Sequence, residues 1–331
     1  MAVKNRCCIL TCYIGTLPAW TQQWLESCRY NINFDFIVIT DDRTRYNIPQ
    51  NVSFLYTELS ELKNRFQKEI EFPICLESAY KLCDYKPLYG LAFCEELAGY
   101  EFWGHCDMDM IFGDLSRFLT DDIFNSYDRI GTFGALILYR NDEKMNHLYK
   151  LPGAAFTYKV VFSNPESYNF DEVFGYNLIC KRNDIKWYNY GHSFILDKKR
   201  ESPLCFAEVK NAVKQRVLWK NRKIYLLNMD LDNNMSVTEY MYFHFSQTYY
   251  DMKEFKDNVV FSSNKCHRIQ DKELYMYLLN EKEEINEKNK GCLDKFLKKT
   301  FRQKYIRIRQ EMVRQYIDRR YYKHMDGEGR L

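Results

Sequence analysis

Short apolar segments alternate with amphipathic ones through the first third of the sequence, and this alternation limits the folds open to the chain. Residues 7–12 and 36–40 have the unbroken apolar character of strands buried on both faces. Between them, Trp20, Trp24 and Leu25 recur at helical spacing. The order strand, helix, strand predicts a βαβ unit and therefore a parallel sheet.

The same pattern continues beyond the first unit. We expect strands at 52–56 and 100–106, helices at 59–71 and 79–97, and further strands at 129–139, 224–227 and 240–245. The predicted fold class is α/β, with a mostly parallel sheet flanked by helices. In such sheets ligands bind outside the carboxyl ends of the strands, so the residues that follow each strand carry the functional hypotheses.

Composition excludes several classes of protein. With 46% hydrophobic residues the chain can bury a core, so disorder is excluded. Its 12 cysteines include no Cys-x-x-Cys pair, which argues against a zinc site or disulfide framework and favours free thiols in a reducing cytoplasm. Polar residues interrupt the uncharged stretch 7–25, so we expect no export signal, and no segment has the roughly 18 apolar residues of a membrane span.

The composition changes near residue 255, which divides the chain into a main domain, 1–255, and a tail, 256–331. Segment 288–324 holds 13 lysines and arginines against three acidic residues, interleaved with apolar side chains. This pattern predicts a basic amphipathic helical tail that binds an anionic membrane surface. A merely solvated helix is the alternative. We expect no nucleic-acid partner, because no recognised reader motif accompanies the basic residues.

Two aspartates close the strand predicted at 100–106. On extended backbone, residues i and i+2 point to one side, so Asp107 and Asp109 present two carboxylates to the same spot. Beside apolar strand such a pair needs a neutralising partner, and a hard divalent cation that bridges to a diphosphate would supply it. A second Asp-x-Asp, Asp230 and Asp232, lies in a polar segment that predicts a solvated turn.

Several motifs occur together and in order over residues 7–250. They are residues 13–18 (YIGTLP), 81–87 (KLCDYKP), 103–109 (WGHCDMD), 138–141 (LYRN) and 170–172 (FDE). With these motifs the chain resembles a bacterial family of GT-A-type glycosyltransferases from capsule and O-antigen gene clusters. The resemblance implies a GT-A (Rossmann-like) fold, a UDP-linked sugar donor, and Mn²⁺ or Mg²⁺ at Asp107 and Asp109. It also implies transfer of a hexose to a lipid-linked glycan, at the inner face of the plasma membrane.

Residues after the first two strands are candidates for the nucleotide. Thr11, Tyr13 and Gly15 would cradle the nucleobase and ribose, with Tyr13 as a stacking face and Gly15 allowing close backbone approach. Asp41 or Asp42 would accept hydrogen bonds from uracil or ribose. An ordinary strand-to-helix turn and a helix cap are the alternatives.

Three charged residues precede the acidic strand end. Lys81 or Lys86 would meet the diphosphate, and Asp84 a sugar hydroxyl. A solvated helical face is the alternative. Late in the domain, His244 would complete the coordination of the metal ion, as the third ligand does in many GT-A enzymes; the alternative is a hydrogen-bonded core histidine.

Asp171 and Glu172 form the other acidic pair in a site-like context. If the reaction inverts the anomeric centre, one of them would deprotonate the acceptor hydroxyl; if it retains, they would bind the donor sugar or acceptor. A helix cap is the alternative. Two other function classes stay open: a sugar nucleotidyltransferase, which also uses paired aspartates and a metal, and a non-catalytic glycan-binding protein.

Overall fold

The computed structural model describes residues 5–172, 175–197, 212–230, 234–245, 252, 259–261 and 266–268. The chain divides into two compact units, Met1–Ile269 and Gln270–Leu331, and every described residue lies in the first. The predicted tail, 256–331, lies outside the described residues except for two short strands near its start. Its helical character therefore stays a prediction.

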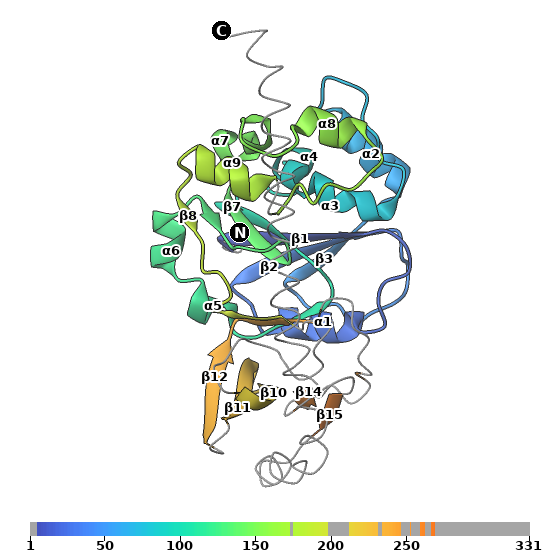
Figure 1. Ribbon diagram of the computed structural model, residues 1–331. Coiled ribbons are helices and arrows are strands. Elements are labelled where there is room, and N and C mark those ends of the chain that lie inside the picture. Colours follow the sequence, from blue (N-terminus) through green and yellow to red (C-terminus); the bar gives the residue numbers. More distant parts are fainter. Residues whose placement is uncertain are drawn as a thin grey trace. The chain divides into compact units, whose positions relative to one another are not determined.

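A seven-stranded sheet forms the centre of the first unit (Figure 1). In spatial order its strands are β3 (Val52–Tyr56), β2 (Phe34–Thr40), β1 (Cys7–Tyr13), β4 (Phe102–Cys106), β7 (Leu136–Arg140), β6 (Arg129–Ile130) and β8 (Trp187–Tyr188). All neighbours are parallel except that β7 runs antiparallel to both β4 and β6. The predicted α/β fold class with a mostly parallel sheet is confirmed.

Helices cover both faces of this sheet (Figure 1). One face carries α2 (Leu59–Gln67), α3 (Leu82–Tyr85), α4 (Tyr89–Ala92), α7 (Glu143–Asn146), α8 (Tyr158–Ser163) and α9 (Tyr176–Arg182). The other carries α1 (Thr21–Arg29), α5 (Leu115–Phe118) and α6 (Asp121–Ser126). Because successive strand residues face opposite ways, Cys8 and Leu10 belong to the first core, and Cys7 and Ile9 to the second.

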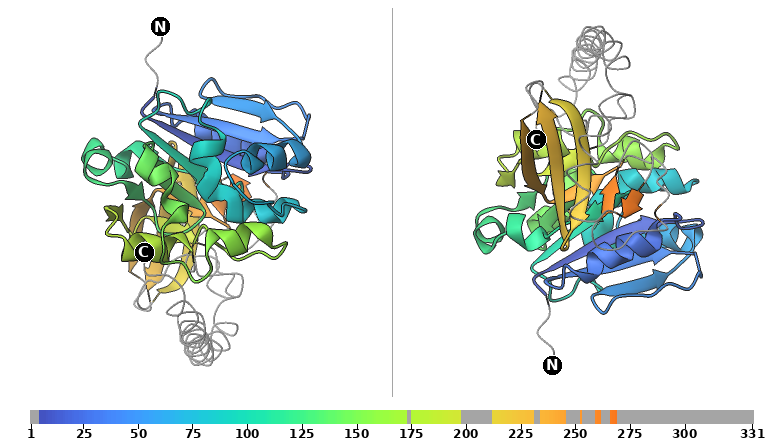
Figure 2. Two further views of the ribbon diagram at one scale, coloured as in Figure 1. Left: turned by 90° about the horizontal axis from the view of Figure 1, so that it is seen from above. Right: turned by 90° about the horizontal axis from the view of Figure 1, so that it is seen from below.

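Two smaller sheets complete the described fold. The first is antiparallel, with the order β12 (Met235–Tyr240), β11 (Lys223–Asp230), β10 (Ala212–Lys220), β14 (Val259–Phe261) and β15 (Cys266–Arg268) (Figure 2). The second places β13 (Tyr242–His244) between β5 (Met110–Phe112) and β9 (Ile195–Asp197). The first unit thus runs past residue 255, since β14 pairs with β10.

Two predicted elements differ from the structure. The helix expected over 79–97 is a series of short turns: η1 (Ala79–Lys81), α3, η2 (Lys86–Leu88) and α4. Pro87 lies inside this series and cannot donate a helical hydrogen bond. The strand expected over 129–139 is two antiparallel strands, β6 and β7, joined by a turn in which Gly131 has φ +117°.

The described part of the chain also includes η3 (Leu148–Lys150). None of its helices combines the length and the apolar character that crossing a membrane requires.

Candidate active site

The carboxyl ends of three parallel strands bring the first candidate residues to one edge of the sheet. In register, Tyr13 of β1 pairs with Thr40 of β2, and Leu10 of β1 pairs with His105 of β4. The segments that follow these strands therefore leave the sheet side by side. They carry Gly15, Asp41 and Asp107, as the sequence predicted from the order of the strands.

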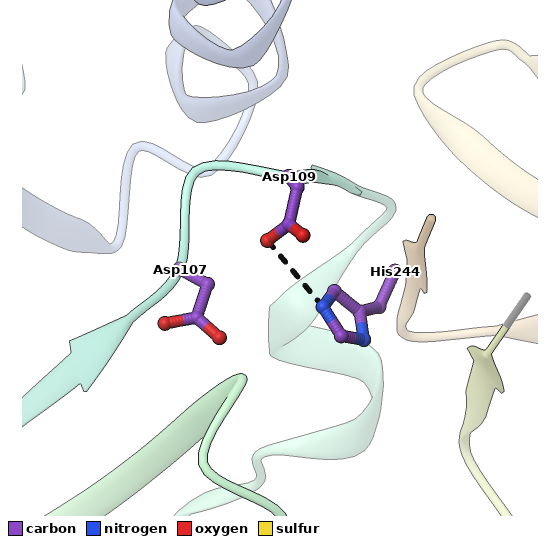
Figure 3. Close-up of side chains that lie close together, drawn as sticks. All are labelled: Asp107, Asp109 and His244. Atoms are coloured by element: carbon purple, nitrogen blue, oxygen red, sulfur yellow. Dashed lines mark ion pairs between the residues drawn. The ribbon is translucent and has the colours of Figure 1, made fainter. Parts of the chain in front are cut away.

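Asp107, Asp109 and His244 meet beside this edge (Figure 3). Asp107 and Asp109 lie on the loop between β4 and β5, whereas His244 comes from β13. Each offers one ligand atom, and these atoms all lie within 4.8 Å of one another. All three residues are half-buried. The predicted approach of His244 to Asp109 is present, with 3.4 Å between His244 Nε2 and Asp109 Oδ1.

Backbone hydrogen bonds fix the acidic loop. The Asp107 amide donates to the Ala135 carbonyl at 3.0 Å, and the Phe245 amide donates to the Asp109 carbonyl at 2.9 Å. The Trp20 indole Nε1 donates to the carbonyl between them, that of Met108, at 2.8 Å. Each of the three loop residues is thus tied to a different segment, so contacts within the protein hold the backbone that carries the two carboxylates.

The charges around His244 favour a cation between the carboxylates. Its Nδ1 lies 3.0 Å from Asp197 Oδ1, on the side of the ring away from Asp109. Burial lowers the pKa of His244, but hydrogen bonds to Asp109 and Asp197 outweigh it and raise this pKa to about 10. The imidazole is therefore protonated at neutral pH when no other cation is present. Positive charge at this point compensates the acidic groups.

The donor set suits a divalent cation. Two carboxylates and an imidazole are hard and borderline ligands of the kind that hold Mn²⁺ or Mg²⁺. At metal–ligand distances of about 2.1 Å, neighbouring ligand atoms of an octahedron lie about 3 Å apart and opposite ones about 4.2 Å, so the three side chains would draw together slightly around a bound ion. A bound dication would take over the charge compensation that the imidazolium supplies, and His244 would bind it as the neutral base.

Lys86 connects the first aspartate to the acidic pair of the 170–172 segment. Its Nζ lies 2.9 Å from Asp107 Oδ1 and 3.0 Å from Asp171 Oδ2, and donates to the Gly134 carbonyl at 3.2 Å. Burial alone would lower the pKa of Lys86, but the two carboxylates outweigh it and hold this pKa well above its ordinary value. All three ammonium protons thus have protein acceptors, so Lys86 orients Asp107 in this structure.

Asp171 and Glu172 differ in their surroundings. Asp171 is buried, and burial raises its pKa to about 6 despite the nearby Lys86. Glu172 is half-buried, and its Oε1 accepts the Gly134 amide at 2.9 Å. A Cβ on residue 134 would lie 2.5 Å from that Oε1 and 2.7 Å from Asp171 Oδ2, so a larger residue fits only if these carboxylates shift. The backbone of Gly134 therefore joins Glu172 to Lys86, whereas Asp171 contacts Lys86 directly.

Lys81 and Asp84 form a separate, enclosed pair. Lys81 Nζ lies 2.8 Å from Asp84 Oδ2 and also donates to the carbonyls of Val161 and Glu166. Asp84 in turn accepts the backbone amides of Tyr168 and Phe170. Their side chains are 1% and 0% exposed. We therefore leave both out of the proposed site, since they brace the 161–170 segment.

The candidates for the nucleotide lie at the carboxyl end of β1. Thr11 is buried, whereas Tyr13 is exposed, as stacking on a ligand requires. Gly15 is exposed with φ +105°, and its amide donates to Asp41 Oδ1 at 2.7 Å. Asp41 thus fixes the turn after β1. Contacts of these residues with a nucleotide stay predictions.

The sequence analysis missed Asp197 and the backbone of Gly134. Asp197 follows two buried apolar residues of β9, the same signal that singled out Asp107.

His105, near the end of the strand that precedes Asp107, is a core residue. Burial and the Lys86 and Arg129 charges hold its pKa well below the usual range, so it is neutral. Asp230 ends β11, whereas Asp232 lies outside the described residues.

Residues 9–278 match the model of one protein family, described as "Family of unknown function (DUF6625)". The chain belongs to this family. Membership assigns no activity, and no curated protein matches the sequence.

Three solved proteins with partial structural similarity are glycosyltransferases by name. The galactosyltransferase LgtC, in complex with donor and acceptor sugar analogs, has 10% identity and a TM-score of 0.36 over 57% of this chain and 75% of its own. Mouse xyloside xylosyltransferase 1 has 8% identity and a TM-score of 0.37, over 58% of this chain and 88% of its own. The glycosyltransferase GlyE of Streptococcus pneumoniae TIGR4 has 10% identity and a TM-score of 0.30, over 57% of this chain and 46% of its own. These scores are low, so function is argued below from the site residues.

Proposed function

We propose that this protein is a divalent-metal-dependent glycosyltransferase of the GT-A type. The observation that carries the proposal is the convergence of Asp107, Asp109 and His244 at the carboxyl edge of the parallel sheet. That edge is where α/β proteins bind nucleotides, and exposed Tyr13 lies at the end of the neighbouring strand. The proposed cofactor is Mn²⁺ or Mg²⁺.

The proposed donor is a UDP-linked hexose, with the nucleoside beside Tyr13, Gly15 and Asp41 and the diphosphate beside Asp107 and Asp109. A bound divalent cation would offset the negative charge that develops on the departing diphosphate. The chain's own contribution is to hold both aspartates in place. Lys86 orients Asp107, and the Phe245 amide anchors the Asp109 backbone.

Of the acidic pair, we propose that Glu172 contacts the reacting sugars and that Asp171 supports it. Glu172 is half-buried, so a hydroxyl can reach it, whereas Asp171 is 3% exposed and paired with Lys86. In an inverting reaction Glu172 would accept the proton of the acceptor hydroxyl. In a retaining reaction it would hydrogen-bond to the donor sugar or the acceptor.

The deciding experiment incubates the full chain with a panel of UDP-sugars and Mn²⁺ and measures release of UDP. We expect release from at least one UDP-hexose, its loss with EDTA, and its recovery on adding Mn²⁺. Asp109→Asn should lower the rate by at least about 100-fold while circular dichroism stays unchanged. Wild-type turnover in Asp109→Asn would exclude the metal role.

The same panel separates the alternatives. Consumption of a nucleoside triphosphate with a sugar phosphate, and no UDP release, would instead identify a sugar nucleotidyltransferase. Oligosaccharide binding without metal-dependent affinity for UDP would identify a glycan-binding protein.

We further propose that the acceptor is a lipid-linked oligosaccharide of capsule or O-antigen synthesis, and that the enzyme works on the cytoplasmic face of the bacterial plasma membrane. The support is the basic segment 288–324, whose positive charges suit an anionic lipid surface. Co-sedimentation of the full chain with anionic and with zwitterionic vesicles tests this. We expect binding to anionic vesicles alone, weakened by salt; equal binding to both would exclude an electrostatic anchor.

A further inference from the structure

The small sheet β5–β13–β9 carries an acidic residue that the proposed function does not use. In register, His244 of β13 pairs with Met110 of β5 on one side and with Asp197 of β9 on the other. Asp109 directly precedes Met110. The sheet therefore places His244 beside Asp197 on the neighbouring strand and close to Asp109, which enters the third strand.

The two ring nitrogens of His244 have different partners. Nδ1 lies 3.0 Å from Asp197 Oδ1, and Nε2 lies 3.4 Å from Asp109 Oδ1. A carboxylate that accepts the Nδ1 proton leaves the Nε2 lone pair as the metal-binding atom, and it also fixes the rotation of the ring. We propose that Asp197 is a positioning residue, which aims His244 Nε2 at the cation between Asp107 and Asp109.

The packing beneath the three residues keeps this arrangement rigid. Leu196 and Phe243 adjoin Asp197 and His244, and Ile111 pairs with Phe243 across the sheet; all three are fully buried and belong to one core cluster. By contrast, the Asp197 side chain is 37% exposed. Among the described residues, the group of ligand atoms close enough to share one ion consists of Asp107, Asp109 and His244, without Asp197. Asp197 would therefore act through His244 and not as a ligand itself.

The test measures Mn²⁺ binding to the full chain by electron paramagnetic resonance, with no substrate present. Mutation of a carboxylate that orients a metal-bound histidine typically lowers metal affinity by about 10- to 100-fold. Asp197→Ala should therefore weaken Mn²⁺ binding by about that factor. Asp197→Asn should weaken it less, because the amide oxygen still accepts from Nδ1. Asp122→Asn, an exposed change on α6, is the matched control and should have no effect.

A double-mutant cycle with His244→Ala isolates the positioning effect. If Asp197 acts through His244, Asp197→Ala has no further effect on Mn²⁺ binding once His244 is absent. An equal loss in both backgrounds would mean that Asp197 acts directly by its charge, and no loss in either would mean no role; both results overturn the proposal.

This inference rests on the proposed metal site, and the two can fail separately. If Asp109→Asn leaves Mn²⁺ binding unchanged, the metal site itself fails and the inference with it. If Asp109→Asn abolishes Mn²⁺ binding and Asp197→Ala does not change it, only the positioning role fails.

Discussion

Two buried lysines five residues apart serve different purposes. Lys81 and Asp84 are enclosed: they hydrogen-bond to each other and to backbone groups, and Lys81 also lies over the ring of Tyr168. Lys86 pairs with Asp171, which is enclosed, and with Asp107, whose side chain is 33% exposed at the metal site. Burial of a charged side chain therefore does not show whether the residue has a structural role or contributes to a functional site. The distinction lies in whether one partner of the pair still faces a ligand.

The largest expected effect is on stability and concerns the enclosed pair. Lys81→Met leaves the fully buried Asp84 without its cation, so the free energy of unfolding should fall by about 3–5 kcal/mol. Urea denaturation measures the change. Exposed Lys68→Met is the control and should change stability by less than about 0.5 kcal/mol. A Lys81→Met protein as stable as wild type would remove the structural role.

Lys86→Met should cost less stability than Lys81→Met but should lower activity strongly. Water can solvate the partly exposed Asp107, and Asp171 can take up a proton, so the loss of stability should be smaller than for Lys81→Met. UDP release should fall by about 100-fold because Asp107 loses its orientation. Both quantities are measured on the same sample. A stability loss as large as that of Lys81→Met, with unchanged activity, would contradict the comparison.

Asp171 should make stability depend on pH. Burial raises its pKa from 3.8 to about 6, so between these values the folded protein holds a proton that the unfolded chain has released. The contribution of Asp171 to stability therefore falls as pH rises through this window, by an amount on the order of 2 kcal/mol. Asp171→Asn cannot titrate, so the stability of wild type relative to this variant should decline from pH 4 to pH 6. A relative stability that rises over this range would mean that Lys86 dominates.

Gly134→Ala should affect turnover less than Lys86→Met does. The added methyl meets Glu172 Oε1 and Asp171 Oδ2, and the half-buried Glu172 can move away at modest cost. We expect about a tenfold loss of UDP release, with a loss of stability of about 1–3 kcal/mol. Thermal unfolding measures the loss of stability, and the rate of UDP release measures the loss of activity. Unchanged activity would show that the position of Glu172 does not matter to turnover.

Local sequence patterns predicted the parts of the fold that local chemistry determines. The first βαβ unit, the strand 52–56 and the acidic loop after β4 follow from apolar runs and their ends. The pairing of His244 with Asp109 was also predicted, from an aromatic strand late in the domain. The strands and the acidic loop followed from the spacing of residues along the chain, whereas the role of His244 also rested on the resemblance to GT-A enzymes.

The remaining features depend on contacts between distant segments. Nothing near Lys81 in the sequence indicates that residues 161–170 enclose it. Asp197 reaches His244 only because β9 and β13 pair in one register, and a shift by one residue would turn its side chain to the other face. The turn at Gly131 was missed because the prediction joined the apolar residues on either side of it into one strand, although Gly131 and Gly134 lie between them.

The small β5–β13–β9 sheet also has a consequence for biosynthesis. The pairing of β5 with β13 brings Asp109 and His244 together. These strands are far apart in the sequence, since β5 ends at Phe112 and β13 begins at Tyr242. A ribosome must therefore release most of the first unit before the proposed metal ligands can come together. The emerging polypeptide would display Asp107 and Asp109 without His244 for much of translation, so the proposed site could bind a cation only late, once β13 has been added.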